Sequence, residues 1–385
     1  MSPETQYEII GLAFLFGILI LPKILQRYLI PGPLTCFVFG FIATLYFPEL
    51  QRHQTLALLA TLGISSLFLF AGLEVHLDEL RRCQWPIFSY LAIQLLLLAA
   101  TALAGISWAG LSWQAATLVG LALLTPSTGF ILDSLAGWGV DQHETFWITT
   151  KAISGELLAL GLLFVVLQSD SLERVVISAT VLWLIVVGLP LLFVVFGRVV
   201  LPHAPGSEFS FLVLMGLITA YVIKHLGVYY LVGAFLVGFL AQQLRSRVPT
   251  LVGVGVMSAV RLFASFFIPF YFFASGLRVP PEVLNWEALG LGVAASVLFL
   301  PLRVGVIWLL RKPVFDEHWR NRLRISITLT PTLIFTLVLA SILRDRYQLS
   351  DTIYCALLIY ALINTALPSF ILPKPVDFDP ETVNY

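Results

Sequence analysis

Long apolar segments recur along the chain, separated by short polar stretches. A helix that crosses the hydrocarbon layer of a membrane needs about 20 mostly apolar residues, and it must satisfy its own backbone hydrogen bonds. Thirteen segments fit this description, at about 7–28, 32–48, 55–75, 86–108, 113–136, 143–168, 174–199, 208–225, 228–244, 255–277, 286–310, 322–343 and 351–372. The pattern predicts an all-α polytopic membrane protein with about thirteen transmembrane helices, followed by a short tail at 373–385.

Composition supports this prediction and narrows the possible functions. Of the 385 residues, 59% are hydrophobic and 11% are charged, with a mean hydropathy of +0.93, whereas soluble domains carry roughly a quarter charged residues. The formal net charge is zero and no long charged run occurs, so no nucleic-acid partner is predicted. Cys36, Cys83 and Cys355 lack the spacing of metal ligands, and we therefore predict buried thiols, no structural metal and no cofactor.

Lys and Arg in the short loops predict the orientation, because these residues accumulate on the cytoplasmic side. Thirteen of them follow odd-numbered segments and six follow even-numbered segments. This bias predicts an N-terminus outside and a cytoplasmic C-terminus in the cell (inner) membrane. The first residues carry no Lys or Arg, so the first segment is predicted to be a retained helix rather than a signal peptide.

Two ionisable residues lie deep within predicted helices, Glu156 in the sixth segment and Arg303 in the eleventh. Such a group costs about 2.5–3.5 kcal/mol on insertion scales, which makes each a candidate functional residue. Desolvation favours a protonated carboxyl group and a nearby cation favours the carboxylate, so Glu156 is predicted to carry a proton and a cation in turn. The alternative for Glu156 is that it only pairs with Lys151 or Arg303 to hold helices together. The separate alternative for Arg303 is that its side chain extends to the membrane surface.

Two predicted helices are interrupted by a proline between hydroxyl residues, at 125–128 and at 330–332. They are seven segments apart and therefore cross the membrane in opposite directions, as in transporters whose inverted repeats bring broken helices together around the substrate. Hydroxyl and carbonyl oxygens suit small hard cations. The predicted cation and proton site therefore comprises Glu156, Thr125, Ser127, Thr128, Ser154, Thr330 and Thr332. For either break alone, the alternative is a simple proline kink.

Three motifs give the chain a resemblance to a known family. They are Leu67–Val75 followed by Arg81 and Arg82, Gly233–Gly238, and Phe267–Leu277. With them, the chain resembles the monovalent cation:proton antiporters, in particular the second branch, which includes sodium/proton antiporters and Kef-type potassium/proton systems. The resemblance implies an inverted-repeat fold with two crossed broken helices, a homodimer and elevator-type alternating access. It also implies a moving core, at about 55–168 and 255–372, and a scaffold formed by the remaining segments.

The resemblance also assigns roles to individual residues. The paired acidic motif of the family falls on Gly155 and Glu156, and its basic residue falls on Arg303. This chain departs from the family pattern, because position 155 carries no acid and position 156 carries Glu where Asp is usual. Family members without the first acid and with an arginine tend to be electroneutral, which implies one-for-one exchange here. Lys151, a second charge-compensating candidate, could either tune Glu156 or disable it.

The resulting hypothesis is a secondary active antiporter that exchanges H+ for Na+ or K+, with membrane lipids and a second copy of the chain as its other partners. A transport-inactive sensor or scaffold of the same fold is the main alternative. A sodium-coupled symporter of organic anions is disfavoured by Glu156 and by the number of segments. The chain contains neither an HExxH motif nor a recognisable pairing of nucleophile and base, so we do not predict an enzyme.

Overall fold

The computed structural model describes residues 3–28, 30–82, 84–169, 171–225, 231–283, 285–311 and 319–372. Ten helices in these ranges are long and apolar enough to cross a membrane. Three shorter apolar helices, Gly11–Gln26, Gly32–Tyr46 and Leu231–Gln243, bring the total to the predicted thirteen. The all-α architecture is therefore confirmed, whereas the predicted tail at 373–385 and Cys83 lie outside the described residues.

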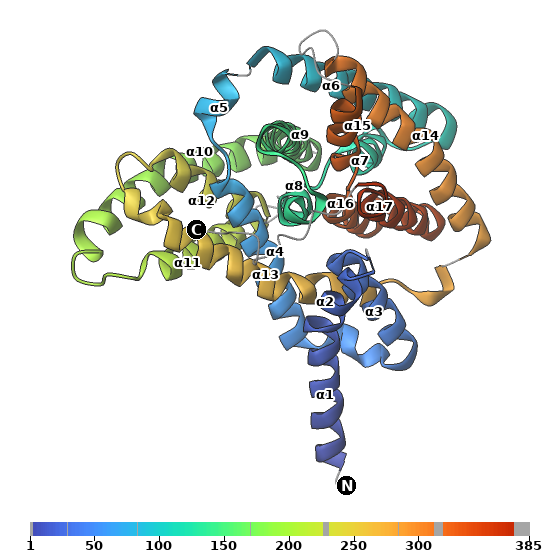
Figure 1. The fold of residues 1–385 in the computed structure, drawn as a ribbon, viewed down its shortest axis with the longest axis horizontal. Coiled ribbons are helices and arrows are strands. Elements are labelled where there is room, and N and C mark those ends of the chain that lie inside the picture. The colour runs from blue at the N-terminus through green and yellow to red at the C-terminus, as the bar shows by residue number, and fades with distance from the viewer. Residues whose placement is uncertain are drawn as a thin grey trace, which may run out of the picture.

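The helices follow one another in Figure 1 as α1 (Pro3–Leu19), α2 (Leu21–Gln26), α3 (Gly32–Tyr46), α4 (Gln54–Leu73), α5 (Leu77–Arg82), α6 (Gln84–Ala109), α7 (Trp113–Leu124), α8 (Thr128–Ser134), α9 (Gln142–Gln168), α10 (Leu172–Val195), α11 (Glu208–His225), α12 (Leu231–Gln243), α13 (Val254–Leu277), α14 (Trp286–Arg311), α15 (Trp319–Thr328), α16 (Leu333–Tyr347) and α17 (Asp351–Ile371). Short turns of other helical types are η1 (Pro48–Arg52), η2 (Leu135–Trp138), η3 (Phe196–Val200), η4 (Pro249–Val252) and η5 (Pro281–Val283).

By their contacts, most of the helices form two groups. The broken-helix group contains α6–α9 and α14–α17, in which α14 packs on α17, α6 packs on α7, and α16 packs on both α7 and α17. The α4–α13 group contains α3, α4, α11, α12 and α13, in which α13 packs on α3 and α4, and α12 packs on α4 and α11. Within the broken-helix group, each half consists of one long helix, one broken helix and one further long helix, as expected for a repeat.

Glycines bring the helices of the α4–α13 group into close contact. A Cβ atom on Gly40 of α3 would overlap the carbonyl group of Phe273 in α13, and Gly276 of α13 meets the α3 backbone in the same way. Gly72 of α4 and Gly238 of α12 form the corresponding pair. Within a membrane, helices associate largely through such close contacts between small residues. Each of the three motifs that carry the family resemblance contributes one of these glycines.

Apolar side chains cover the outer faces of several helices. Trp183 and Leu191 of α10 and Leu298 of α14 are each more than half exposed. Only 17% of the most apolar window of α6, α10 and α14 is buried within the protein. A large exposed apolar surface on a protein of this length requires a nonpolar environment, so these faces are the ones that lipid would cover.

Candidate functional site

The two proline breaks lie against each other at the centre of the broken-helix group. The backbone N–H of Ser127, between α7 and α8, donates to the carbonyl of Pro331, between α15 and α16, over 2.8 Å. The hydroxyl oxygen of Ser127 accepts from the backbone N–H groups of Ile334 at 3.0 Å and Phe335 at 3.3 Å. These are among the first N–H groups of α16, which have no partner within their own helix. The predicted crossing of two broken helices is therefore confirmed.

Arg303 of α14 satisfies the carbonyl end of α15. Its guanidinium group donates to the carbonyls of Thr330 at 2.8 Å and Leu329 at 2.9 Å. The C-terminal end of a helix carries partial negative charge, so a buried cation is favourable here. The structure thus places the charge of Arg303 against the second break rather than in an ion pair with Glu156.

Polar side chains from three other helices satisfy the carbonyl end of α7. The hydroxyl of Tyr360, in α17, donates to the carbonyl of Leu123 and accepts from Arg303 at 3.4 Å. Two further donors complete the set, with Gln94 bonded to the Leu124 carbonyl at 3.3 Å and Thr336 bonded to the Ala122 carbonyl at 2.7 Å. Sequence reasoning did not identify these three residues, although each is a polar side chain in an otherwise apolar segment.

Glu156 lies at the N-terminal end of α8, beside the first break. One carboxylate oxygen, Oε2, accepts a hydrogen bond of 3.2 Å from the backbone N–H of Thr128, the first residue of α8. The side chain is only 4% exposed. An N–H group and the positive end of a helix both favour the ionised carboxylate, while burial favours the neutral acid. These opposing effects act on a group that is removed from bulk water.

Some of the predicted hydroxyl ligands are available to an ion. The hydroxyls of Thr125 and Thr332 are fully buried and form no hydrogen bond with any described residue. The same holds for Thr365 of α17, which sequence reasoning did not identify. A buried polar group without a partner costs about 1–3 kcal/mol, so these oxygens favour an ion or a water molecule at the crossing.

The hydroxyls of Ser127, Ser154 and Thr330 already have protein partners. Thr330 donates to the Ile327 carbonyl at 2.8 Å and lies 3.3 Å from the carbonyl of Asn364. Ser154 donates to the Thr150 carbonyl within α9, over 2.7 Å. The backbone N–H of Thr128 donates to Glu156, while its buried hydroxyl forms no hydrogen bond with any described residue and is available in the same way as those of Thr125 and Thr332. The predicted hydroxyls thus fall into two sets: those of Ser127, Ser154 and Thr330 form hydrogen bonds within the protein, and those of Thr125, Thr128 and Thr332 are available.

Lys151 and Gly155 lie on one face of α9, against Tyr90 of α6. The ammonium group of the buried Lys151 is 5.4 Å from the centroid of the Tyr90 ring, a cation–π distance. A Cβ atom on Gly155 would lie 3.3 Å from the Tyr90 hydroxyl and 3.4 Å from the Pro126 ring. The space that a first acidic residue would need is therefore bordered closely by Tyr90 and the first break.

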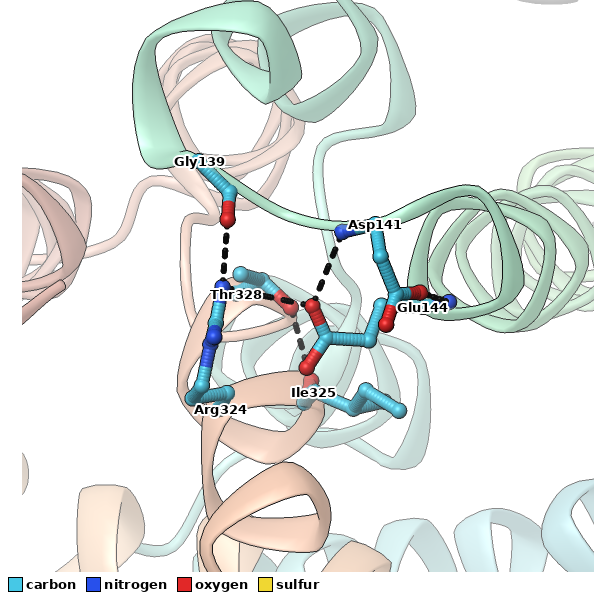
Figure 2. A network of polar contacts seen from close by, with 6 residues as sticks. All are labelled: Gly139, Asp141, Glu144, Arg324, Ile325 and Thr328. Atoms are coloured by element: carbon cyan, nitrogen blue, oxygen red, sulfur yellow. Dashed lines mark hydrogen bonds and ion pairs between the residues drawn. The ribbon is translucent and has the colours of Figure 1, made fainter. Parts of the chain in front are cut away.

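A partly buried ion pair joins α9 to α15 at the end of the group where both helices begin (Figure 2). Oε2 of Glu144 lies 3.3 Å from Arg324, which also donates to the carbonyl of Gly139 at 2.6 Å. Asp141 and Glu144 form a capping box at the start of α9, each accepting from the backbone N–H of the other. The Asp-x-x-Glu spacing is the sequence signal that could have identified Glu144.

A cavity of about 430 Å³ opens beside the start of α9. Leu132 of α8 and Thr149 of α9 form one wall, and Glu74 and Arg261 line the side towards the α4–α13 group. Leu132 lies four residues beyond Thr128 on α8, a rise of about 6 Å along the helix axis. The cavity therefore approaches the end of α8 at which Glu156 is bound.

Comparison with known proteins supplies a family and a fold. A sequence profile described as "Sodium/hydrogen exchanger, transmembrane" matches residues 10–376. The structure is similar to that of the sodium proton antiporter MjNhaP1 from Methanocaldococcus jannaschii at pH 8, with a TM-score of 0.66. The two chains are 15% identical, and the match covers 94% of this chain and 96% of the other. Among curated proteins, no sequence matches.

Proposed function

Since the chain belongs to the sodium/hydrogen exchanger family, we propose that it exchanges a monovalent cation, Na+ or K+, for protons and that Glu156 carries both in turn. The family match confirms the resemblance to monovalent cation:proton antiporters. One observation carries the proposal for the site: the buried Glu156 carboxylate, held by the Thr128 N–H, lies at the crossing of two broken helices. The available hydroxyls of Thr125 and Thr332 belong to the same two breaks.

In this mechanism the proton and the cation exclude each other at Glu156. The protonated acid releases H+ and the resulting carboxylate binds the cation, while the oxygens of Thr125, Thr332 and Thr365 replace part of the hydration shell of the ion. Protonation removes the negative charge that holds the cation. Either occupant adds one positive charge to the same carboxylate, so a one-for-one exchange moves no net charge across the membrane.

Arg303 and Lys151 have fixed roles in the same proposal. Arg303 remains bonded to the carbonyls of Leu329 and Thr330 at every step, because its donors hold the carbonyl end of α15. The charge of Lys151 on the Tyr90 ring tunes the field at Glu156 without leaving the protein. Neither residue exchanges a proton or a cation with the solution, so their charges stay constant and the cycle remains electroneutral.

The broken-helix group is proposed to move against the α4–α13 group, in an elevator-type alternation within a homodimer. We draw this core more narrowly than the ranges 55–168 and 255–372, because α13 packs on α3 and α4 and α4 packs on α12, whereas the contact of α4 with α8 is small. Hydrogen bonds across the crossing would keep the broken-helix group intact as it moves. With the N-terminus outside, the 430 Å³ cavity beside α9 is the cytoplasmic route to Glu156.

Exchange by purified protein in acidified liposomes tests the proposal. Adding Na+ or K+ outside should drive proton efflux, reported by a trapped pH dye, and Glu156→Gln should abolish it. Glu173→Gln, an exposed acid at the start of α10, is the matched control and should retain the full rate. A silent wild type, or unchanged efflux in Glu156→Gln, would overturn the proposal. Electroneutrality fails separately if an imposed membrane potential changes the rate of Na+ exchange.

A transport-inactive sensor or scaffold is the second candidate function. It is favoured by the buried Lys151 five residues before Glu156, and by the absence of an acid at Gly155. If the wild type is silent, restored exchange in Lys151→Ala would support this alternative. Gly155→Asp is a weaker test, because Tyr90 and Pro126 border that position closely.

A further inference from the structure

A second and larger cavity, of about 690 Å³, lies between the two groups of helices. Thr61 of α4, Tyr221 of α11 and Ser275 of α13 line it on the side of the α4–α13 group. Residues of α9, α16 and α17 line the facing side. The α9 contribution is Leu167, at the opposite end of that helix from the 430 Å³ cavity. A molecule bound here would touch both groups at once.

The charged side chains that line this cavity are mostly basic. Lys224, Arg278 and Arg346 contribute three positive charges, and Asp345 contributes one negative charge, which leaves a net charge of +2. All four side chains are exposed and lie where their helices end. Like charges concentrated around a partly enclosed space raise its potential and attract counter-ions of opposite sign. The lining therefore attracts anions and repels the cations that the protein is proposed to transport.

Serine residues of both groups of helices contribute to the lining of the same cavity. Ser65 of α4 is 3% exposed, lines the cavity, and its Oγ forms no hydrogen bond with any described residue. Ser275 and Ser341 add two further hydroxyls to the lining. Hydroxyl donors together with Lys and Arg are the groups that bind phosphate oxygens. The interior thus offers short-range hydrogen bonds in addition to the charge at the mouth.

We propose that this cavity binds a phosphate-bearing anion, supplied either by a lipid head group or by free phosphate. Its volume lies within the range of about 300–1,000 Å³ that is usual for small-molecule sites. The anion neutralises the lining and bridges Lys224 and Arg278, on one group of helices, to Arg346 on the other. Binding of the anion does not depend on the proposed transport function. Its regulatory effect does rest on that function: an occupant that contacts both groups slows their relative movement, and therefore slows the proposed exchange.

Binding is tested on the full chain purified in an uncharged detergent. The melting temperature should rise with phosphatidylglycerol, relative to phosphatidylcholine, or with inorganic phosphate, relative to chloride at equal ionic strength. The double variant Lys224→Gln/Arg278→Gln should lose at least half of that rise. Arg346 is left intact because it also donates to the Leu167 carbonyl at 2.8 Å. Ser275→Ala, at a partly exposed lining residue, should weaken the apparent affinity about tenfold while eluting as a monodisperse species.

Arg344→Gln is the matched control, since Arg344 lies at the same end of α16, pairs with Asp351 at 3.1 Å and does not line the cavity. A rise with phosphatidylglycerol alone identifies the lipid head group as the source, and a rise with inorganic phosphate identifies the free anion. No rise with either probe, or an equal rise in the double variant, overturns the proposal. Exchange measured in liposomes with and without phosphatidylglycerol then tests the regulatory effect, so failure of transport and failure of binding are distinguished.

Discussion

The backbone N–H of Ser127 donates to the carbonyl of Pro331 over 2.8 Å, so the break in one broken helix is bonded directly to the break in the other. The side chain of Ser127 extends this contact by accepting from the first N–H groups of α16. Arg303 and Tyr360 join the two carbonyl ends at the same place. Four interrupted helix ends thus share one set of bonds, and Glu156 lies at one of them.

Ser127→Ala should destabilise the crossing. The substitution removes the acceptor for the N–H groups of Ile334 and Phe335, and loss of a helix cap costs about 0.5–2 kcal/mol. We expect a lower melting temperature and slower cation-driven proton efflux. Ser107→Ala is the control, because Ser107 is an exposed serine of α6 whose hydroxyl donates to the Leu103 carbonyl one turn earlier. Equal stability of the two variants would contradict the capping role.

Competition at Glu156 predicts that the apparent KM for the cation depends on pH. As pH falls, protonation removes the negative charge that holds the cation, so a higher cation concentration is needed. By mass action, the apparent KM rises by up to about tenfold per pH unit once the protonated form dominates. Initial rates of proton efflux, measured over a matrix of pH and Na+ concentration, check this. A KM that stays constant while the maximal rate changes would exclude direct competition.

The pair of Glu144 and Arg324 should stabilise the protein cooperatively. Glu144→Gln leaves Arg324 without its acid, and breaking a fully buried pair costs about 3–5 kcal/mol. A smaller loss is expected here, because the Arg324 side chain is 30% exposed. The double variant Glu144→Gln/Arg324→Gln should therefore lose less stability than the sum of the two single variants, by more than about 0.5 kcal/mol. Additive losses in thermal unfolding would show that the two residues are not coupled.

Gly72→Ala should disrupt the contact between α4 and α12. The added methyl group would overlap the backbone near Phe235, which neither helix can relieve without moving apart. Overpacking of this kind costs about 1–3 kcal/mol, so we expect a lower melting temperature and poor recovery as a monodisperse species. Gly161→Ala of α9 has no atom within 4 Å of the new Cβ and should behave like the wild type. Comparable behaviour of both variants would refute close packing at Gly72.

The thirteen segments, the two breaks and the position of Glu156 were all predictable from the sequence. Each spanning helix must be apolar along its own length, so hydropathy reveals it without reference to any neighbour. The proline between two hydroxyl residues is also a local feature of the sequence. So is the single carboxylate within an apolar segment, and both can be recognised without knowledge of any neighbouring helix. Contacts that depend on backbone atoms were not predictable: Thr128 was expected to contribute a hydroxyl, and the structure adds a hydrogen bond from its backbone N–H to Glu156.

Residue order along the chain thus decides what must lie in lipid and which segments are interrupted, because those properties depend on a few consecutive side chains. Tertiary structure alone decides which partners meet at the interruptions. Tyr360 reaches Leu123 across 237 positions of sequence, and Arg303 serves the end of α15 rather than Glu156. Helix ends leave carbonyl and N–H groups that any nearby donor or acceptor can satisfy, and only the assembled group of helices determines which side chain is near enough to do so.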